Sequence, residues 1–124
     1  MATFVLVPGS WHGGWCWWKV APLLRAAGHT VYPVTLTGLG ERAHLATPQT
    51  GLDTHILDVV NLLAYEELTG VVLVGHSYGG MVITGVADRA AARLRHLVYL
   101  DALVPAAGQA AVDLLPGAAQ HWRA

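Results

Sequence analysis

The sequence has few charged residues and a single cysteine. Only 12% of its 124 residues are Asp, Glu, Lys or Arg, and the formal net charge is −1. Because no cluster of basic residues is present, we expect no nucleic-acid partner. Cys16 stands alone, which excludes an internal disulfide and favours a reducing compartment. We therefore expect a cytoplasmic protein.

Two kinds of apolar segment are also missing. The amino terminus runs from Met1 almost directly into a short apolar run, without the basic region and cleavage site of a signal peptide. No uninterrupted apolar run is long enough to cross a bilayer, so we expect no membrane partner. The histidines and carboxylates show no metal-ligand spacing. We expect neither a metal nor another cofactor.

Apolar residues are abundant instead, at 54% of the chain. This content is typical of strands that are buried on both faces, and the length suits one domain, residues 1–124. Short apolar runs alternate with segments of helical periodicity. This alternation predicts an α/β fold, in which a parallel sheet of about four strands carries helices on both faces. The expected strands are 4–7, 30–34, 71–74 and 96–100, and the expected helices are 16–27, 52–63 and 81–92.

Local signals place the ends of two of these helices. Gly28 follows the first helix and is a natural carboxyl-terminal cap. A polar, glycine-bearing loop spans 35–51, and Thr50 with Asp53 resembles a capping box that opens the second helix.

The third strand runs straight into Gly75-His76-Ser77-Tyr78-Gly79, a Gly-x-Ser-x-Gly motif. A strand, this motif and a following helix together predict a very tight turn that presents the serine hydroxyl at the carboxyl end of the strand. Glycines two positions either side of the serine remove the β-carbons that would collide in such a turn. The turn also leaves backbone N–H groups at a helix amino terminus, where they could stabilise an oxyanion.

A loop rich in tryptophan follows the first strand. It holds Trp11 and Trp15, and Trp17 and Trp18 come directly after it. We expect these side chains mainly to fill the core and hold the loop in place, and Cys16 to pack as a small apolar residue.

Three segments together resemble the α/β-hydrolase superfamily, and more narrowly the group of plant methylesterases, hydroxynitrile lyases and their bacterial esterase relatives. The segments are Phe-Val-Leu-Val-Pro-Gly-Ser-Trp-His-Gly-Gly-Trp at 4–15, Gly-His-Ser-Tyr-Gly-Gly at 75–80 and Tyr-Leu-Asp-Ala-Leu-Val-Pro at 99–105. Similar hydroxynitrile lyases carry Thr at the position of Gly9, so the resemblance favours a carboxylic-ester hydrolase acting on a small-molecule ester.

The resemblance also implies roles for individual residues. Ser77 would be the nucleophile, and the backbone N–H groups of Tyr78 and Ser10 would form the oxyanion hole. The residues expected to contact substrate are Gly9, Trp11 and His76.

The resemblance covers only the front half of the family's fold. In the superfamily the catalytic acid and histidine follow the serine, normally after strands later than the fourth one here. We therefore expect weak or no activity from this chain alone, with a cap region beginning near 105–124. By resemblance the strand order is second, first, third, fourth. The fourth strand is then an open edge, through which a homo-oligomer could form.

Several residues keep alternative interpretations. Asp101 is a candidate acid or a turn cap, and His121 is a remote candidate base. His12 is expected to fix its loop, and His76 to be packed and hydrogen-bonded while pointing away from Ser77.

Two other classes of function remain open. A non-catalytic module for small-molecule binding or assembly would use the pocket without chemistry. A dinucleotide-binding module is a weaker alternative, based on Gly38-x-Gly40-x-x-Ala43 after a strand. That fingerprint also needs an acid about 20 residues on, at the tip of the next strand, and Asp58 at that offset lies inside an expected helix.

Overall fold

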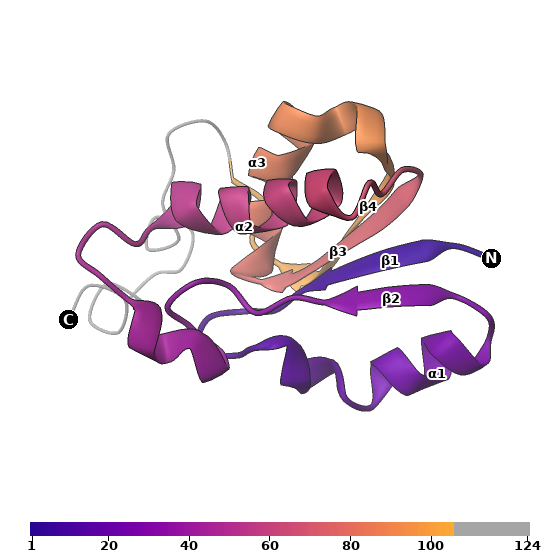
Figure 1. The fold of residues 1–124 in the computed structure, drawn as a ribbon, viewed down its shortest axis with the longest axis horizontal. Helices are drawn as coiled ribbons and strands as arrows, with labels where there is room; N and C mark the ends of the chain where they lie inside the picture. The colour runs from indigo at the N-terminus through magenta and orange to yellow at the C-terminus, as the bar shows by residue number, and fades with distance from the viewer. Residues whose placement is uncertain (106–124) are drawn as a thin grey trace.

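The computed structural model describes residues 1–105, which form a four-stranded, fully parallel sheet covered by helices (Figure 1). The strand order is β2-β1-β3-β4, as the resemblance implied. The predicted α/β architecture is therefore confirmed. The strands are β1 (Thr3–Val7), β2 (Thr30–Pro33), β3 (Val71–Ser77) and β4 (Leu94–Ala102).

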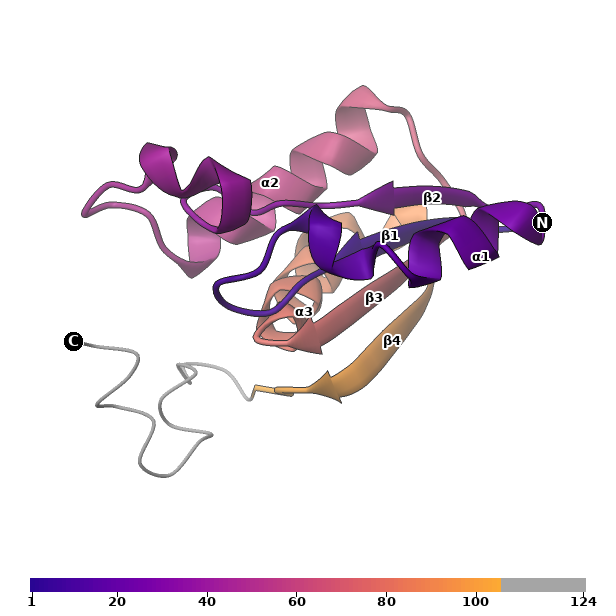
Figure 2. The ribbon, with the colours of Figure 1, turned by 90° about the horizontal axis from the view of Figure 1, so that it is seen from below.

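Helices cover both faces of this sheet. The α-helices are α1 (Val20–Ala26), α2 (Leu52–Tyr65) and α3 (Gly79–Ala90), and the 3₁₀ turns are Gly14–Trp17, Gly40–Leu45 and Ala91–Arg93. α1 lies on one face of the sheet, and α2 and α3 lie on the other (Figures 1 and 2).

Alternating side chains of the central strands build two separate cores. Val5 and Leu73 point to the side of α2 and α3, in a cluster that also contains Val59 and Ile83. Leu6 and the neighbouring apolar residues of β3 point the other way, against Trp17 and Ala21 at the start of α1. The period of two along each strand therefore explains why apolar residues are consecutive in β1 and β3.

β4 is the least covered strand. Val98 and Leu100 are 40% and 49% exposed. Figure 2 shows α1 beside β1 and β2, while β4 lies beyond it at the edge of the sheet. Within residues 1–105 no strand pairs with the outer side of β4, so the expected open edge is confirmed for this part of the chain.

Several local predictions need correction. The first helix does not begin at Cys16, because Gly14–Trp17 forms a 3₁₀ turn and α1 starts only at Val20. Thr50 does not cap α2. The N-cap is Gly51, whose N–H donates to Thr54 Oγ1 (3.1 Å), whereas Thr50 Oγ1 accepts from the backbone N–H of Thr47.

The expectation for the tryptophans is wrong for three of the four. Trp17 is buried, but Trp11, Trp15 and Trp18 are 63%, 53% and 68% exposed. Of these three, only Trp15 lies in the 3₁₀ turn; Trp11 precedes it in the loop after β1, and Trp18 lies between the turn and α1. Gly28 is in the predicted place, with a φ of +94° directly after α1.

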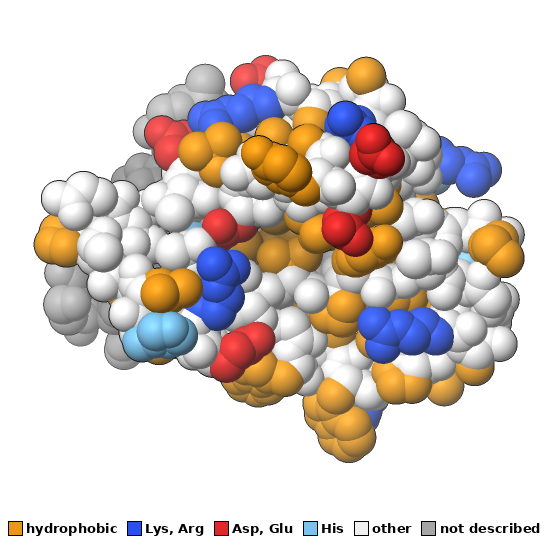
Figure 3. Space-filling view, in the orientation of Figure 1, with side chains coloured by type: hydrophobic (Ala, Val, Ile, Leu, Met, Phe, Trp, Pro, Cys, Tyr) orange, Lys and Arg blue, Asp and Glu red, His pale blue; other side chains and the backbone are white. Residues whose placement is uncertain are grey.

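On the face of Figure 3, acidic and basic side chains are interspersed. Arg89 of α3 and Asp53 of α2 form an exposed ion pair at 2.9 Å. No helix within residues 1–105 has the length and apolar character to cross a membrane. His121 and most of the expected cap region, 105–124, lie outside the described residues.

Candidate active site

Ser77 occupies a strained turn between β3 and α3. Its φ is +54°, in the left-handed region that non-glycine residues rarely adopt. The turn is held on both sides, because Met81 N–H donates to the Tyr78 carbonyl and Leu103 N–H donates to the Ser77 carbonyl, each at 2.9 Å. The strained strand–turn–helix predicted from the motif is therefore present.

The glycines around Ser77 are required by the packing of the backbone. A β-carbon on Gly75 would lie 2.5 Å from the carbonyl oxygen of Gly79. One on Gly79 would lie 2.7 Å from the carbonyl oxygen of Val7, at the end of β1. Both obstacles are backbone atoms, which cannot rotate away as a side chain can. The motif spacing therefore allows the turn to pack directly on the end of β1.

The loop after β1 lies against the serine. A β-carbon on Gly9 would lie 3.1 Å from Cβ of Ser77, so the Gly9–Ser10 segment and the turn are in contact. Trp11 follows with a φ of +63° and a largely exposed side chain. The structure thus brings Gly9 into contact with Ser77, 68 positions further along the chain, and Ser10 and Trp11 directly follow Gly9.

A polar clamp fixes the far end of this loop. Thr35 Oγ1 accepts from the N–H of Gly14 (2.7 Å) and donates to Glu41 Oε2 (2.6 Å), and Arg42 donates to the Thr35 carbonyl. The hydroxyl of Thr35 lowers the pKa of Glu41, because it stabilises the carboxylate. The clamp ties the loop that holds Ser10 to the loop after β2.

Tyr78 follows the serine, and its side chain packs on the opposite side of the sheet from α1. Its hydroxyl is bonded to His55 of α2 at 2.8 Å, and burial raises the pKa of Tyr78, which keeps the phenol protonated. His55 was missed by the sequence analysis. The available signal was a polar residue among Leu52, Ile56 and Val59, on the apolar face of the helix.

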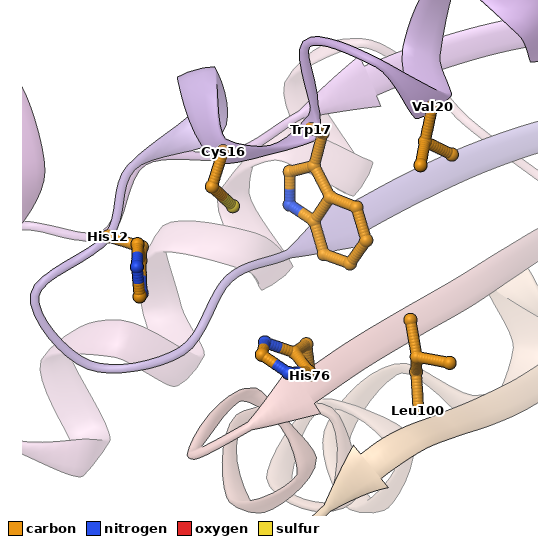
Figure 4. Close-up of a pocket in the computed structure, with 6 residues that line it drawn as sticks. All are labelled: His12, Cys16, Trp17, Val20, His76 and Leu100. Carbon is orange, nitrogen blue, oxygen red and sulfur yellow. The ribbon is translucent and has the colours of Figure 1, made fainter.

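His76 points to the other face and lines a cavity of about 320 Å³ between the loop after β1, the start of α1 and β4 (Figure 4). Its ring meets Trp17 edge to face, with centroids 6.4 Å apart. The expected packing is present, but within residues 1–105 the ring of His76 has no hydrogen bond, so that part of the expectation is wrong. Ser77 is not among the lining residues. These are His12, Cys16, Trp17, Val20, His76 and Leu100.

Trp17, which lines the cavity, carries an unpaired polar atom. Nε1 of Trp17 is buried and has no hydrogen-bond acceptor within residues 1–105. Cys16 lies beside it, and burial raises the pKa of the Cys16 thiol. The walls are otherwise largely apolar.

The remaining sequence candidates are placed as follows. His12 packs its ring near Trp15, with centroids 5.8 Å apart. Asp101 is exposed, with a φ of +46°, at a bulge near the end of β4. Gly38 precedes a 3₁₀ turn and Gly40 is its first residue, so the two glycines do not open an α-helix, and Asp58 binds Thr37 from inside α2.

Comparison with known proteins agrees with this geometry. The model of the alpha/beta hydrolase family matches residues 4–124. The chain belongs to that family.

Individual relatives are similar over about half of their length. A carbendazim-hydrolysing esterase from Nocardioides sp. (strain SG-4G) is 59% identical over 95% of this chain and 49% of its own. Methylesterase 1 of Arabidopsis thaliana is 38% identical, over 82% of this chain and 40% of the relative. An extracellular α/β-hydrolase from a Paenibacillus species superimposes with a TM-score of 0.88 at 32% identity, covering 98% of this chain and 49% of that one. The chain thus spans about half the length of the relatives it matches.

Proposed function

We propose that this chain carries the nucleophile half of a serine hydrolase that acts on small carboxylic esters, with Ser77 as the nucleophile. The observation that carries the proposal is the positive φ of Ser77 in a tight turn that contacts the Gly9–Ser10 loop. Strain of this kind is retained where a function needs it. Two relatives, a carbendazim-hydrolysing esterase and a methylesterase, support the same class of substrate.

In this proposal Ser77 Oγ attacks the ester carbonyl, and its proton passes to a base. The carbonyl oxygen becomes an oxyanion that accepts hydrogen bonds from the N–H groups of Tyr78 and Ser10. The alcohol leaves with a proton, and water then hydrolyses the acyl-serine to release the acid. Gly9 leaves room beside the serine, while Trp11 and His76 are proposed to contact the substrate.

The 124 residues alone are proposed to turn over esters weakly. Full-length relatives are about twice as long, and the family resemblance places the acid and the histidine in the part that this chain does not match. When a triad member is missing, the oxyanion hole and substrate binding still accelerate the reaction about 10³- to 10⁴-fold over the rate in water. The 105–124 segment is proposed to begin the cap.

The test is hydrolysis of p-nitrophenyl acetate by the purified chain and by Ser77→Ala. We expect slow release of p-nitrophenol that disappears in the variant, with unchanged circular dichroism. Equal release by the two folded proteins would refute the role of Ser77. Fast turnover that depends on Ser77 would refute the proposed weakness of the chain alone.

The cavity beside His76 favours a second candidate, a binding module without chemistry. Its largely apolar lining, with the rings of His12 and His76 as polar groups, suits an apolar molecule that carries a hydrogen-bonding group. Stoichiometric binding of an uncharged ester that is unaffected by Ser77→Ala, in a protein that shows no turnover, would favour this candidate over the hydrolase.

The edge of β4 is proposed to pair with a second copy of the chain in a reducing, cytoplasmic setting. Antiparallel pairing centred on Val98 would bring Arg95 near Asp101 of the second copy, twice by symmetry, with both residues at bulges that bound the regular part of β4. Opposite charges facing each other across strands are stabilising.

Sedimentation analysis tests this pairing. We expect a dimer that Arg95→Asp weakens and the double variant Arg95→Asp/Asp101→Arg restores, while Glu66→Arg at the end of α2 leaves it unchanged. A monomeric wild-type chain would contradict the pairing. So would a double variant that forms no more dimer than Arg95→Asp alone.

A further inference from the structure

His55 is a buried histidine on α2, in contact with the residue that follows Ser77. It is 6% exposed and is the one buried polar or charged side chain among the described residues. Its ring meets that of Tyr78 edge to face, with centroids 5.6 Å apart. A buried polar side chain costs stability unless it is hydrogen-bonded, so its partners are informative.

The two ring nitrogens of His55 have different partners. Nε2 lies 2.9 Å from the carbonyl oxygen of Thr37, and Nδ1 lies 2.8 Å from the hydroxyl of Tyr78. A carbonyl oxygen can only accept, so Nε2 must carry the hydrogen. In the neutral ring Nδ1 is then an acceptor, and the Tyr78 hydroxyl donates to it. The pair therefore has one defined direction.

Thr37 is itself held in place by α2. Both of its donors meet the carboxylate of Asp58: the backbone N–H at 2.7 Å from Oδ2 and the hydroxyl at 2.7 Å from Oδ1. Asp58 and His55 are three residues apart, on the same side of the helix. The helix, the loop after β2 and the serine turn are thus joined by one chain of hydrogen bonds.

We infer that His55 is a positioning residue: through the hydroxyl of Tyr78 it holds the backbone N–H of Tyr78 where the oxyanion on an attacked ester forms. The inference rests on the proposed function. A non-glycine residue at positive φ is strained, and such strain persists only when the surroundings hold it. Ser77 has that φ, and Tyr78 is the next residue, so fixing its side chain restrains the turn.

The test is the rate at which a fluorophosphonate labels Ser77 in His55→Leu, Tyr78→Phe and the double variant. Each single change removes the same hydrogen bond, so each is expected to slow labelling about 3- to 10-fold, the range of one net hydrogen bond. The double variant is expected to be no slower than the singles. A rescue variant, His55→Gln, keeps one donor and one acceptor and is expected to recover most of the rate.

The matched control is Tyr99→Phe. The Tyr99 hydroxyl donates to Thr84 Oγ1 at 2.7 Å, because the Thr84 hydroxyl itself donates to the Gly80 carbonyl. This pair lies on the same side of the sheet and involves neither His55 nor Tyr78. Its loss is expected to lower stability without changing the labelling rate. Labelling that is unchanged in folded His55→Leu and Tyr78→Phe, or slowed equally by Tyr99→Phe, would overturn the inference.

A second measurement separates this inference from the proposed function. If Ser77 of the wild type is not labelled at all, the proposed function fails, and nuclear magnetic resonance decides the role of His55. We expect hydrogen on Nε2 of His55, and faster exchange of the Tyr78 amide in His55→Leu and Tyr78→Phe than in Tyr99→Phe. Hydrogen on Nδ1 alone, or unchanged exchange, would overturn it.

Discussion

The two faces of the sheet are covered to very different degrees. Towards α2 and α3, Leu73, Ile83 and Leu63 are completely buried. Towards α1, Val98 and Leu100 of β4 remain 40% and 49% exposed, and a cavity of about 320 Å³ lies beside them. The first face is closed and the second is half open.

The candidate site lies where the two faces meet, and each contributes differently. Tyr78 is held from the closed face by His55, whereas His76, its neighbour across Ser77, lines the cavity of the open face. The difference suggests a division of labour. The closed face keeps the serine turn rigid, and the open face offers the room and the apolar surface that a substrate or further polypeptide needs.

The largest predicted effect compares two leucines, one on each face. Leu73→Ala is expected to lower the free energy of unfolding by about 2–5 kcal/mol, because it leaves a cavity in a closed core. Leu100→Ala, which is already half exposed, is expected to cost about 1 kcal/mol or less. Urea denaturation of both variants measures the difference. Equal losses would show that the open face is as well packed as the closed one.

The next effect concerns the turn between the faces. Gly79→Ala would place a β-carbon 2.7 Å from the backbone oxygen of Val7, and we expect it to destabilise by about 1–3 kcal/mol. Gly51→Ala is the control, because nothing lies within 4 Å of its β-carbon position and its φ is −154°. Thermal unfolding of the pair tests the requirement. If Gly79→Ala unfolded at the same temperature as the wild type, β1 would have to be able to move away from the turn.

A smaller effect, on the reactivity of Cys16, tests how far the open face excludes water. Burial raises the pKa of Cys16, so at a given pH the folded protein holds less thiolate than the unfolded chain. Alkylation by iodoacetamide near neutral pH is therefore expected to be several-fold slower in the folded protein than in the unfolded chain. The two rates are expected to become equal only above the raised pKa. The urea-unfolded chain is the reference. Faster alkylation of the folded protein would contradict a desolvated thiol.

The smallest effect is expected at the surface of the closed face. Arg89→Ala removes the ion pair with Asp53. The side chain of Arg89 is 41% exposed and that of Asp53 is 85% exposed. Exposed pairs contribute about 0–1 kcal/mol, because water and salt screen them. We expect a loss below about 0.5 kcal/mol, measured by urea denaturation at low salt and at 1 M salt. A large loss would mean that the contact between α2 and α3 depends on this pair.

The sequence was sufficient for the elements and for the serine turn, because both depend on local patterns. Alternating apolar and helical segments predicted the α/β class, and the spacing of Gly75, Ser77 and Gly79 predicted the strained turn. The strand order was predicted from the family resemblance, because no local sequence pattern indicates which strands pair with each other. The exposure of β4 followed from that order.

Other features depend on contacts between distant residues. His55 and Tyr78 are 23 positions apart, and no period in the sequence links them. Trp11, Trp15 and Trp18 are largely exposed, although aromatic residues at such spacing usually fill a core. Gly51 replaced Thr50 as the N-cap of α2, because the Thr50 hydroxyl is used by the preceding turn.

The most direct test of the account is intact-mass analysis of the folded chain after incubation with a fluorophosphonate, with Ser77→Ala as the control. The account predicts slow formation of one phosphonyl adduct per chain, located on Ser77 by peptide mapping and absent from the variant. A folded wild-type protein that acquires no adduct, or a variant that keeps it, would contradict Ser77 as the nucleophile.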